Sequence, residues 1–199
     1  VTSIDPTGGY RLFSRAEQRP AVNDSDSLVV LTFSGGGTRA AAFAYGVLEV
    51  LRKTEAIGPK GNRTRLIDAV DVITGVSGGS FTALAYGLYG DKLFADYEQR
   101  FLKRNVQGEI IARAFSPSNW GNLSSLAWGR SELAADLYDE ILFNGATFAD
   151  LDRGNGPLIM ASATDISTGG RIVFTQNIFN VLCSDLNAVR LSRAAAASS

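Results

Sequence analysis

Apolar residues along the chain form two kinds of run, and the two kinds alternate. The continuous runs LVVLTF (28–33) and LIDAVDVIT (66–74) predict strands, the first of them buried on both faces. Each run is followed by a glycine-rich turn and then by apolar residues at helical spacing, over 40–53 and 81–90. The repeated order of strand, glycine loop and helix predicts an α/β domain with a largely parallel sheet.

The second half of the chain continues with the same two patterns. Amphipathic periodicity predicts helices, and short β-branched runs predict a pair of strands around the turn STGG. The predicted elements are helices at 91–115, 131–143 and 184–199, strands at 157–166 and 171–176, and a loop at 116–125. Residues 1–27, rich in proline, glycine and polar side chains, predict an extended N-terminal arm, so the folded domain is expected over 28–199.

Capping residues mark the ends of several predicted helices. Ser131 is expected to begin one helix, and Asn144 with the glycine after it to end the same helix. Thr147 and Asp150 have the spacing of a capping box, which predicts a short helical turn after Thr147. Ser184 is expected to cap the last helix of the sequence.

Composition excludes several function classes without choosing one. The 199 residues carry a formal net charge of −1, so no overall positive field recruits nucleic acid or an anionic membrane. No apolar run reaches the roughly 18 residues of a membrane-spanning helix. The chain has no histidine and one cysteine, Cys183, which argues against a histidine- or thiolate-ligated metal site. We expect Cys183 to be a small buried hydrophobe, and no metal or cofactor is predicted.

Both glycine loops follow predicted strands, and a parallel sheet gathers ligands and catalytic groups at those strand ends. Gly75-Val76-Ser77-Gly78-Gly79 fits G-x-S-x-G, in which a tight strand-to-helix turn presents a serine nucleophile, here Ser77. The helix that follows directs unpaired N–H groups toward the serine oxygen, and a second nest of N–H donors is expected in the glycine triplet SGGGT. The candidate oxyanion-hole residues are Gly35, Gly36, Gly37 and Gly78.

Residues beside the two loops have alternative interpretations. The loop GGGTRA lacks the P-loop pattern G-x-x-x-x-G-K-[ST], and Ala40 breaks G-x-G-x-x-G, which argues against a nucleotide site. Arg39, just inside the helix, is either a substrate-binding residue that pairs with a phosphate or an ion-pairing residue of the surface. Phe81, Leu84 and Tyr86 follow the serine turn and are interpreted as core side chains rather than as an acyl pocket.

Taken together and in this order, the two loops resemble those of the patatin-like phospholipase family, in its bacterial form. LTFSGGGTRAAAFAYGVLEVL resembles that family's glycine-rich oxyanion segment, and VITGVSGGSFTALAY resembles its nucleophile elbow. ASATDISTGGRIVFTQ and LSRAAAASS are similar to the later strand pair and the small-residue helix. The resemblance spans about residues 28–199 and implies a three-layer α/β/α fold, hydrolysis of lipid acyl esters and no cofactor.

The same resemblance explains the absence of histidine and raises a different question. It implies a Ser–Asp dyad, with the aspartate in an Asp-Gly-Gly or Asp-Gly-Ala motif downstream of a helix like 184–199. This sequence contains no Asp-Gly dipeptide. We interpret Asp165 as a strand-end or turn residue and Asp71 as a structural residue of the strand before Ser77. The catalytic aspartate is therefore expected beyond this chain, in a missing C-terminal segment of the same protein.

The resulting hypothesis is a serine esterase of which this chain is an incomplete part, inactive alone. The alternative is a pseudoenzyme, a non-catalytic lipid- or anion-binding module that uses the same loops. Expected partners are a lipid or phospholipid substrate and, transiently, a membrane surface, with no nucleic acid. The expected location is the bacterial cell envelope or the secreted fraction.

Overall fold

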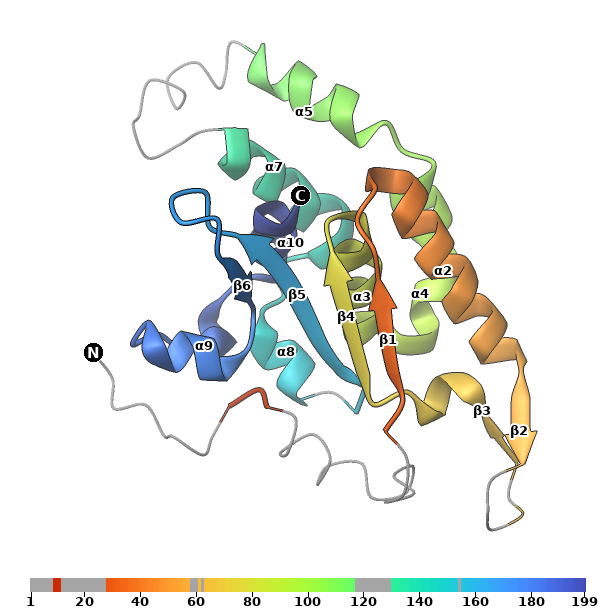
Figure 1. Ribbon diagram of the computed structural model, residues 1–199. Coiled ribbons are helices and arrows are strands. Elements are labelled where there is room, and N and C mark those ends of the chain that lie inside the picture. Colours follow the sequence, from red (N-terminus) through yellow and green to blue (C-terminus); the bar gives the residue numbers. More distant parts are fainter. Residues whose placement is uncertain (1–8, 12–27, 58–60, 62, 117–129, 154) are drawn as a thin grey trace.

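The computed structural model of the protein describes residues 9–11, 28–57, 61, 63–116, 130–153 and 155–199 (Figure 1). The predicted arm at 1–27 and the predicted loop at 116–125 therefore lie largely outside the described residues. Within the arm, Tyr10 is only 1% exposed. Its hydroxyl accepts the N–H of Ile159 at 2.6 Å, and its ring meets that of Phe148 edge-on at 5.9 Å between centroids. At this residue the arm is held against the domain.

A four-stranded sheet lies at the centre of the described chain. Its strands are β1 (Val30–Phe33), β4 (Val72–Val76), β5 (Leu158–Thr164) and β6 (Arg171–Val173), in the spatial order β1-β4-β5-β6 (Figure 1). β1 and β5 both pair with β4 in parallel, and β6 pairs with β5 in antiparallel orientation. A separate antiparallel pair consists of β2 (Glu55–Ile57) and β3 (Arg63–Arg65). The predicted α/β class with a largely parallel sheet is confirmed.

Helices connect the strands and follow them. The α-helices are α2 (Gly37–Lys53), α3 (Gly78–Tyr89), α4 (Leu93–Tyr97), α5 (Val106–Ala114), α7 (Arg130–Tyr138), α8 (Phe148–Arg153), α9 (Gln176–Val181) and α10 (Leu191–Ser198). Short 3-10 helices are η1 (Leu66–Ala69), η2 (Gly90–Lys92) and η6 (Leu186–Ala188), and π-helical turns are η3 (Glu98–Leu102) and η5 (Asp139–Phe143).

Helix α3 is the element against which the sheet packs. Every residue from Gly78 to Tyr86 is buried, and the helix contacts β4, β5, α2 and α10. In Figure 1, α3 and α10 lie behind β4 and β5. A β-carbon on Gly75 of β4 would lie 2.6 Å from the Cα of Ser80, so sheet and helix backbones approach each other closely at this residue.

Strand β1 is more exposed than the sequence predicted. Val30 is 45% exposed and Leu28, just before the strand, is 64% exposed, so the prediction of a strand buried on both faces is wrong. Within the part of the chain that the structure describes, β1 pairs with β4 alone. Because side chains alternate along a strand and Gly75 faces α3, Val76 points to the opposite face of the sheet, where it is also 45% exposed.

The second predicted strand begins later than expected. It was predicted at 66–74, whereas Leu66–Ala69 form the 3-10 helix η1 and β4 begins at Val72. The extended chain starts where the Asp71 N–H donates to the carbonyl of Val29 at 2.9 Å, which is the beginning of the β1–β4 ladder. Sheet pairing, rather than the apolar character of the run, sets this boundary.

The long helix predicted at 91–115 is divided. Its first part comprises α4 and η3, and α5 starts anew at Val106. The Asn105 side chain accepts the N–H of Gly108 at 3.0 Å and so caps the start of α5. The predicted end of the helix 131–143 is confirmed, because Asn144 has left-handed backbone angles (φ 49°, ψ 49°). Ser131 does not cap that helix, since α7 already includes Arg130.

The last predicted helix, 184–199, is also shorter than expected. Ser184 does not cap it; the Asp185 side chain instead accepts the N–H of Asn187 at 2.9 Å and opens the short helix η6. α10 starts only at Leu191. Cys183, predicted to be buried, is exposed. It lies in the turn after α9 with a left-handed backbone (φ 51°), and this turn carries the side chain away from the core.

The capping box at the start of α8 is present in part. The Asp150 carboxylate accepts the backbone N–H of Thr147 at 2.8 Å, as a capping box requires. The Thr147 hydroxyl donates to the same carboxylate at 3.3 Å, whereas the Asp150 N–H donates to the Thr147 carbonyl. The Thr147 N–H and the neighbouring Arg153 lower the pKa of Asp150. This contact fixes a short helix that brings Phe148 and Leu151 into the core.

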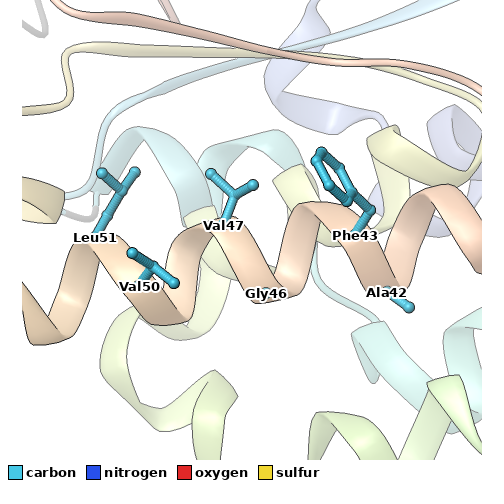
Figure 2. A pocket seen from close by; sticks show the side chains of 6 residues that line it. All are labelled: Ala42, Phe43, Gly46, Val47, Val50 and Leu51. Carbon is cyan, nitrogen blue, oxygen red and sulfur yellow. The ribbon is translucent and has the colours of Figure 1, made fainter.

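Helix α2 has one buried face and one open apolar face. Ala41, Ala44 and Leu48 on the inner face are almost fully buried. On the outer face Phe43 is 76% exposed and Val50 is 63% exposed. An open hollow of about 540 Å³ lies along this face, and its lining side chains are drawn in Figure 2. Its lining residues are Ala42, Phe43, Gly46, Val47, Val50 and Leu51.

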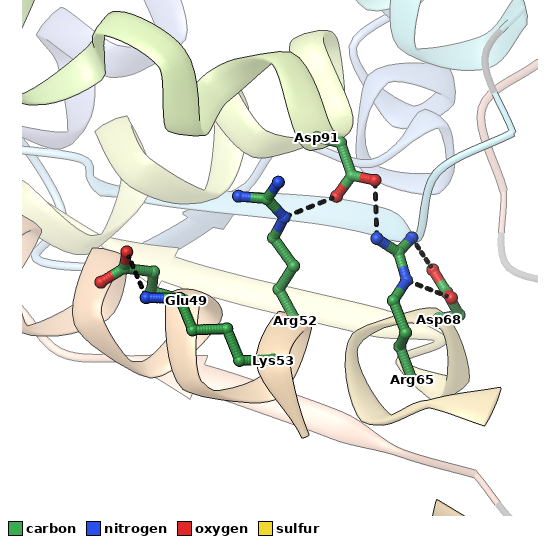
Figure 3. A network of polar contacts seen from close by, with 6 residues as sticks. All are labelled: Glu49, Arg52, Lys53, Arg65, Asp68 and Asp91. Atoms are coloured by element: carbon green, nitrogen blue, oxygen red, sulfur yellow. Dashed lines mark hydrogen bonds and ion pairs between the residues drawn. The ribbon is translucent and has the colours of Figure 1, made fainter. Parts of the chain in front are cut away.

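A network of charged side chains lies near the start of β4, at the end of the sheet away from Ser77. The Arg65 guanidinium donates to both oxygens of Asp68 at 2.7 and 2.8 Å and to Asp91 at 2.7 Å (Figure 3). Arg52 of α2 pairs with the other oxygen of Asp91 at 3.6 Å. The hydrogen bonds to Asp68 and Asp91 raise the pKa of Arg65. The network connects the end of α2, η1 and the turn after α3.

Two helical glycines give opposite expectations for substitution by alanine. A β-carbon on Gly87 of α3 would lie 2.4 Å from Cγ1 of the buried Ile159, whereas a β-carbon on Gly46 of α2 meets nothing within 4 Å. We expect Gly87→Ala to lower the free energy of unfolding by about 1–3 kcal/mol through overpacking. Gly46→Ala should raise it by up to about 1 kcal/mol through helix propensity. Urea denaturation measures both, and equal effects would contradict the close α3–β5 contact.

The lowered pKa of Asp150 gives a prediction for acid stability. A carboxyl whose pKa is depressed by folding stabilises the protein above its unfolded pKa, and this contribution is lost as pH falls through the folded pKa. We expect Asp150→Asn to lower the free energy of unfolding by about 1 kcal/mol at pH 7. The difference from wild type should begin to shrink as pH falls below about 4, the pKa of an unfolded aspartate, and should vanish only below the lower folded pKa. Asp96→Asn, which removes an exposed pair with Arg100, is the control and should have a smaller effect.

Candidate active site

Ser77 occupies a sharp turn between β4 and α3. Its backbone has φ 50° and ψ −122°, a conformation that residues other than glycine rarely adopt. Among the described residues, the only other non-glycine residues with a positive φ are Asn144 and Cys183. Holding a residue there costs on the order of 1–3 kcal/mol, and the surrounding contacts must supply it. The geometry is that of a nucleophile elbow, in which the strained turn presents the serine side chain.

The glycines around Ser77 are required by close backbone contacts. A β-carbon on Gly78 would lie 2.0 Å from the carbonyl oxygen of Gly37, and one on Gly79 would lie 2.7 Å from the carbonyl oxygen of Phe33. Backbone atoms cannot yield by that much, so a side chain at either position would force the two segments apart. The glycines at 78 and 79 therefore reflect packing of the turn against the start of α2 and against β1.

The glycine triplet of the first loop lies directly beside the serine. A β-carbon on Gly35 would come within 3.3 Å of the Ser77 Cβ. Gly36 and Gly37 have positive φ values of 141° and 63°, and α2 begins at Gly37 without a side-chain cap. The first N–H groups of α2 and α3 thus begin next to Ser77. Of the four candidate oxyanion-hole glycines, Gly37 and Gly78 line the cavity with Ser77, Gly35 lies beside the serine, and Gly36 forms the turn between Gly35 and Gly37.

A cavity of about 350 Å³ opens over Ser77. Its walls are mostly apolar, and hydroxyl and amide groups stand among them. The lining residues are Gly37, Thr38, Ser77, Gly78, Phe81, Phe101, Val106, Gln107, Ile110, Tyr138 and Ser199. An apolar pocket that is also lined by a serine hydroxyl suits a molecule with a long apolar part and one polar group.

Aromatic side chains from three segments form one wall of this cavity. Phe81 stacks on Phe101 at 5.1 Å between ring centroids and meets Tyr138 edge-on at 4.6 Å. Phe81 is 4% exposed, so it belongs to the core as predicted and also lines the cavity. Leu84 and Tyr86 are core residues and do not line it.

The cavity walls from α5 and α7 were missed in the sequence. Val106, Ile110 and Tyr138 lie 29 or more positions after Ser77, in segments that were predicted only as amphipathic helices. The apolar spacing of Val106 and Ile110 is the one available signal, and it does not distinguish a cavity wall from core packing.

No carboxylate among the described residues is hydrogen-bonded to the Ser77 hydroxyl. Asp71 accepts the N–H of Val29 at 2.9 Å, at the other end of β4. Asp165 accepts hydrogen bonds from Ser167 and Thr168 in the turn between β5 and β6, and these bonds lower its pKa. Both aspartates have the structural positions that the sequence indicated.

Arg39 does not reach the cavity. It lies on the first turn of α2 with its side chain exposed, and it is not among the residues that line the cavity. It forms no ion pair with another described residue. The structure therefore gives no support to a substrate-binding role for Arg39.

No group of three or more histidine, cysteine, aspartate and glutamate side chains that could hold a metal ion is present among the described residues. Within the same residues, no helix combines the length and the apolar character needed to cross a membrane.

Comparison with solved structures gives matches at low identity. Human GIVD cytosolic phospholipase A2 in complex with methyl gamma-linolenyl fluorophosphonate and terbium chloride has 21% identity and a TM-score of 0.42, over 76% of this chain and 26% of that chain. A second complex of the same human protein has 18% identity and a TM-score of 0.39, over 81% and 25%. Type III effector protein ExoU has 17% identity and a TM-score of 0.44, over 86% and 40%. This chain thus spans less than half the length of each.

Comparison of the sequence with protein families gives the decisive result. A search of curated proteins finds no match. The family model described as Patatin-like phospholipase matches residues 31–199. The matched region begins within β1 and includes both glycine loops, the sheet and α10. Because this match extends over most of the chain, the protein belongs to the patatin-like phospholipase family.

Proposed function

We propose that this protein is a lipid acyl hydrolase in which Ser77 is the nucleophile. The observation that carries the proposal is the strained backbone of Ser77, at φ 50°, beneath an apolar cavity of about 350 Å³. A hydroxyl in such a turn is exposed on the cavity side, while the backbone on its other side is fixed by glycine contacts. The family adds the class of chemistry, hydrolysis of a lipid ester.

The backbone around Ser77 favours particular donors for the oxyanion. The Ser77 N–H already donates to Ser198 Oγ at 2.8 Å, and the Ser80 N–H donates to the Ser77 carbonyl at 2.9 Å. Gly78 occupies the first position of α3, where a helix leaves the N–H without an intrahelical partner. We assign the oxyanion to the Gly78 N–H together with N–H groups of the Gly35–Gly37 loop. Each such donor is worth on the order of 100- to 1000-fold in rate.

The chemical steps follow those of a serine esterase. Ser77 Oγ attacks the ester carbonyl, and its proton passes to a general base as the tetrahedral intermediate forms. The base returns the proton to the leaving alkoxide when the ester bond breaks. Water then attacks the acyl-serine and releases a fatty acid. We propose an aspartate as this base, from an Asp-Gly-Gly or Asp-Gly-Ala motif outside the 199 residues.

The cavity walls suggest the substrate class. Phe81, Phe101 and Ile110 offer apolar contact to an acyl chain, and Thr38 with Gln107 offers polar contact near the serine. We propose that the substrate is a phospholipid or another lipid ester. Because such molecules are present at membrane surfaces, the proposal includes transient contact of the protein with a membrane.

Covalent labelling tests the nucleophile. A long-chain alkyl fluorophosphonate should modify a longer form of the protein, one that includes an Asp-Gly motif, once, and peptide mapping should place the adduct on Ser77. Ser77→Ala should abolish labelling, whereas Ser184→Ala, which removes an exposed hydroxyl far along the chain, should label like wild type. Equal labelling of wild type and Ser77→Ala would show that the nucleophile is assigned wrongly.

Turnover tests the proposed base. The 199-residue chain should hydrolyse a fluorogenic phospholipid in vesicles only slowly, because no described carboxylate contacts Ser77. A longer form that includes an Asp-Gly motif should be at least about 100-fold faster, and changing that aspartate to asparagine should remove the gain. Fast turnover by the 199 residues alone would exclude an external base. Binding of vesicles without labelling or turnover by the longer form would support the alternative, a non-catalytic lipid-binding module.

A further inference from the structure

The Ser198 hydroxyl lies at the junction of three elements. It belongs to the last turn of α10 and its residue is 8% exposed. Its Oγ is 2.8 Å from the backbone nitrogen of Ser77, 2.8 Å from Oγ of Ser80 and 2.6 Å from the carbonyl oxygen of Ser162. One side chain thus bonds to the serine turn, to α3 and to β5.

The direction of each of these hydrogen bonds follows from the groups involved. A carbonyl can only accept, so the single Ser198 hydrogen is donated to Ser162. A backbone N–H can only donate, so Ser198 Oγ accepts from Ser77. The remaining lone pair then accepts from the Ser80 hydroxyl. The Ser198 hydroxyl uses its one donor and both acceptor sites, and no other side-chain atom of the described residues bonds to the Ser77 N–H.

This arrangement bears on the strained conformation of Ser77. Ser77 precedes the first residue of α3, so its N–H has no partner within the helix, and Gly78 and Ser80, which follow it, are buried. Ser198 Oγ is that partner. It also keeps the Ser77 N–H turned toward α10, so the oxyanion donors are left to the residues after and beside the serine.

We infer that Ser198 is a positioning residue for the nucleophile. Its hydroxyl holds the Ser77 backbone in the conformation that presents Oγ to the cavity, and it ties that conformation to β5 through the Ser162 carbonyl. The inference rests on the proposed function of Ser77 and adds to it a residue 121 positions away in the sequence. Loss of the hydroxyl should let the turn relax and move Oγ relative to the oxyanion donors.

The test compares Ser198→Ala with a matched control on the same helix. Ser192→Ala removes a hydroxyl that is 2% exposed on α10 and has no hydrogen bond to the serine turn. Ser198→Ala should lower the second-order rate of fluorophosphonate labelling, and kcat in the active form, by about 10- to 100-fold with KM changed little. Ser198→Thr, which keeps the hydroxyl, should recover most of the rate. Ser192→Ala should label like wild type.

Amide hydrogen exchange tests the contact between Ser198 and the Ser77 N–H independently of the reaction. In wild type the Ser77 amide should be protected from hydrogen exchange, and Ser198→Ala should speed its exchange more than that of amides in β5. Hydrogen exchange at the Ser77 amide that is the same in Ser198→Ala as in wild type would overturn the inference. So would a Ser198→Ala variant that has a lower Tm but is labelled at a rate within twofold of wild type. Failure of the proposed function is distinct, because wild-type protein itself would then not be labelled at Ser77.

Discussion

The contact between the backbones of Gly37 and Gly78 is the constraint on which the site depends. The Gly37 carbonyl oxygen occupies the space that a β-carbon of residue 78 would take, at 2.0 Å. A side chain at residue 78 would therefore separate the two glycine loops, and where the loops meet, α2 and α3 both begin. This close approach places two helix N-termini beside one hydroxyl, which is an environment that stabilises negative charge on oxygen.

The rigid core behind the site maintains that approach. Gly79 of α3 packs against the Phe33 backbone, and Thr82 of the same helix donates to the carbonyl of Ala41 in α2 at 2.9 Å. Thr82 also bonds to the Tyr97 hydroxyl, whose burial raises its pKa. The Ser77 turn, which leads into this buried helix, therefore has little freedom to move. The strained backbone conformation of Ser77 is thus maintained by packing of the neighbouring glycines and by the hydrogen bond to Ser198.

The local parts of this arrangement could be predicted from the sequence, and the long-range parts could not. Ser77, Gly37 and Gly78 were found because a tight turn demands glycine at fixed spacing, which is a local rule. Phe101 and Tyr138 reach the cavity only through packing of distant helices. An apolar run such as 28–33 looks the same whether it is central or at the edge of a sheet, so the exposure of β1 was not predictable. Ser198 is one of several serines near the end of the sequence, and only the fold distinguishes it.

A crystal structure of the fluorophosphonate adduct tests the central claim most directly. The claim is that the Gly37–Gly78 contact and the strained turn together hold Ser77 as a nucleophile facing N–H donors. We predict phosphorus bonded to Ser77 Oγ, a positive φ at Ser77, and a phosphoryl oxygen within hydrogen-bond distance of the Gly78 N–H and of an N–H of the Gly35–Gly37 loop. A phosphoryl oxygen turned away from both loops, or a serine relaxed to negative φ, would contradict the account.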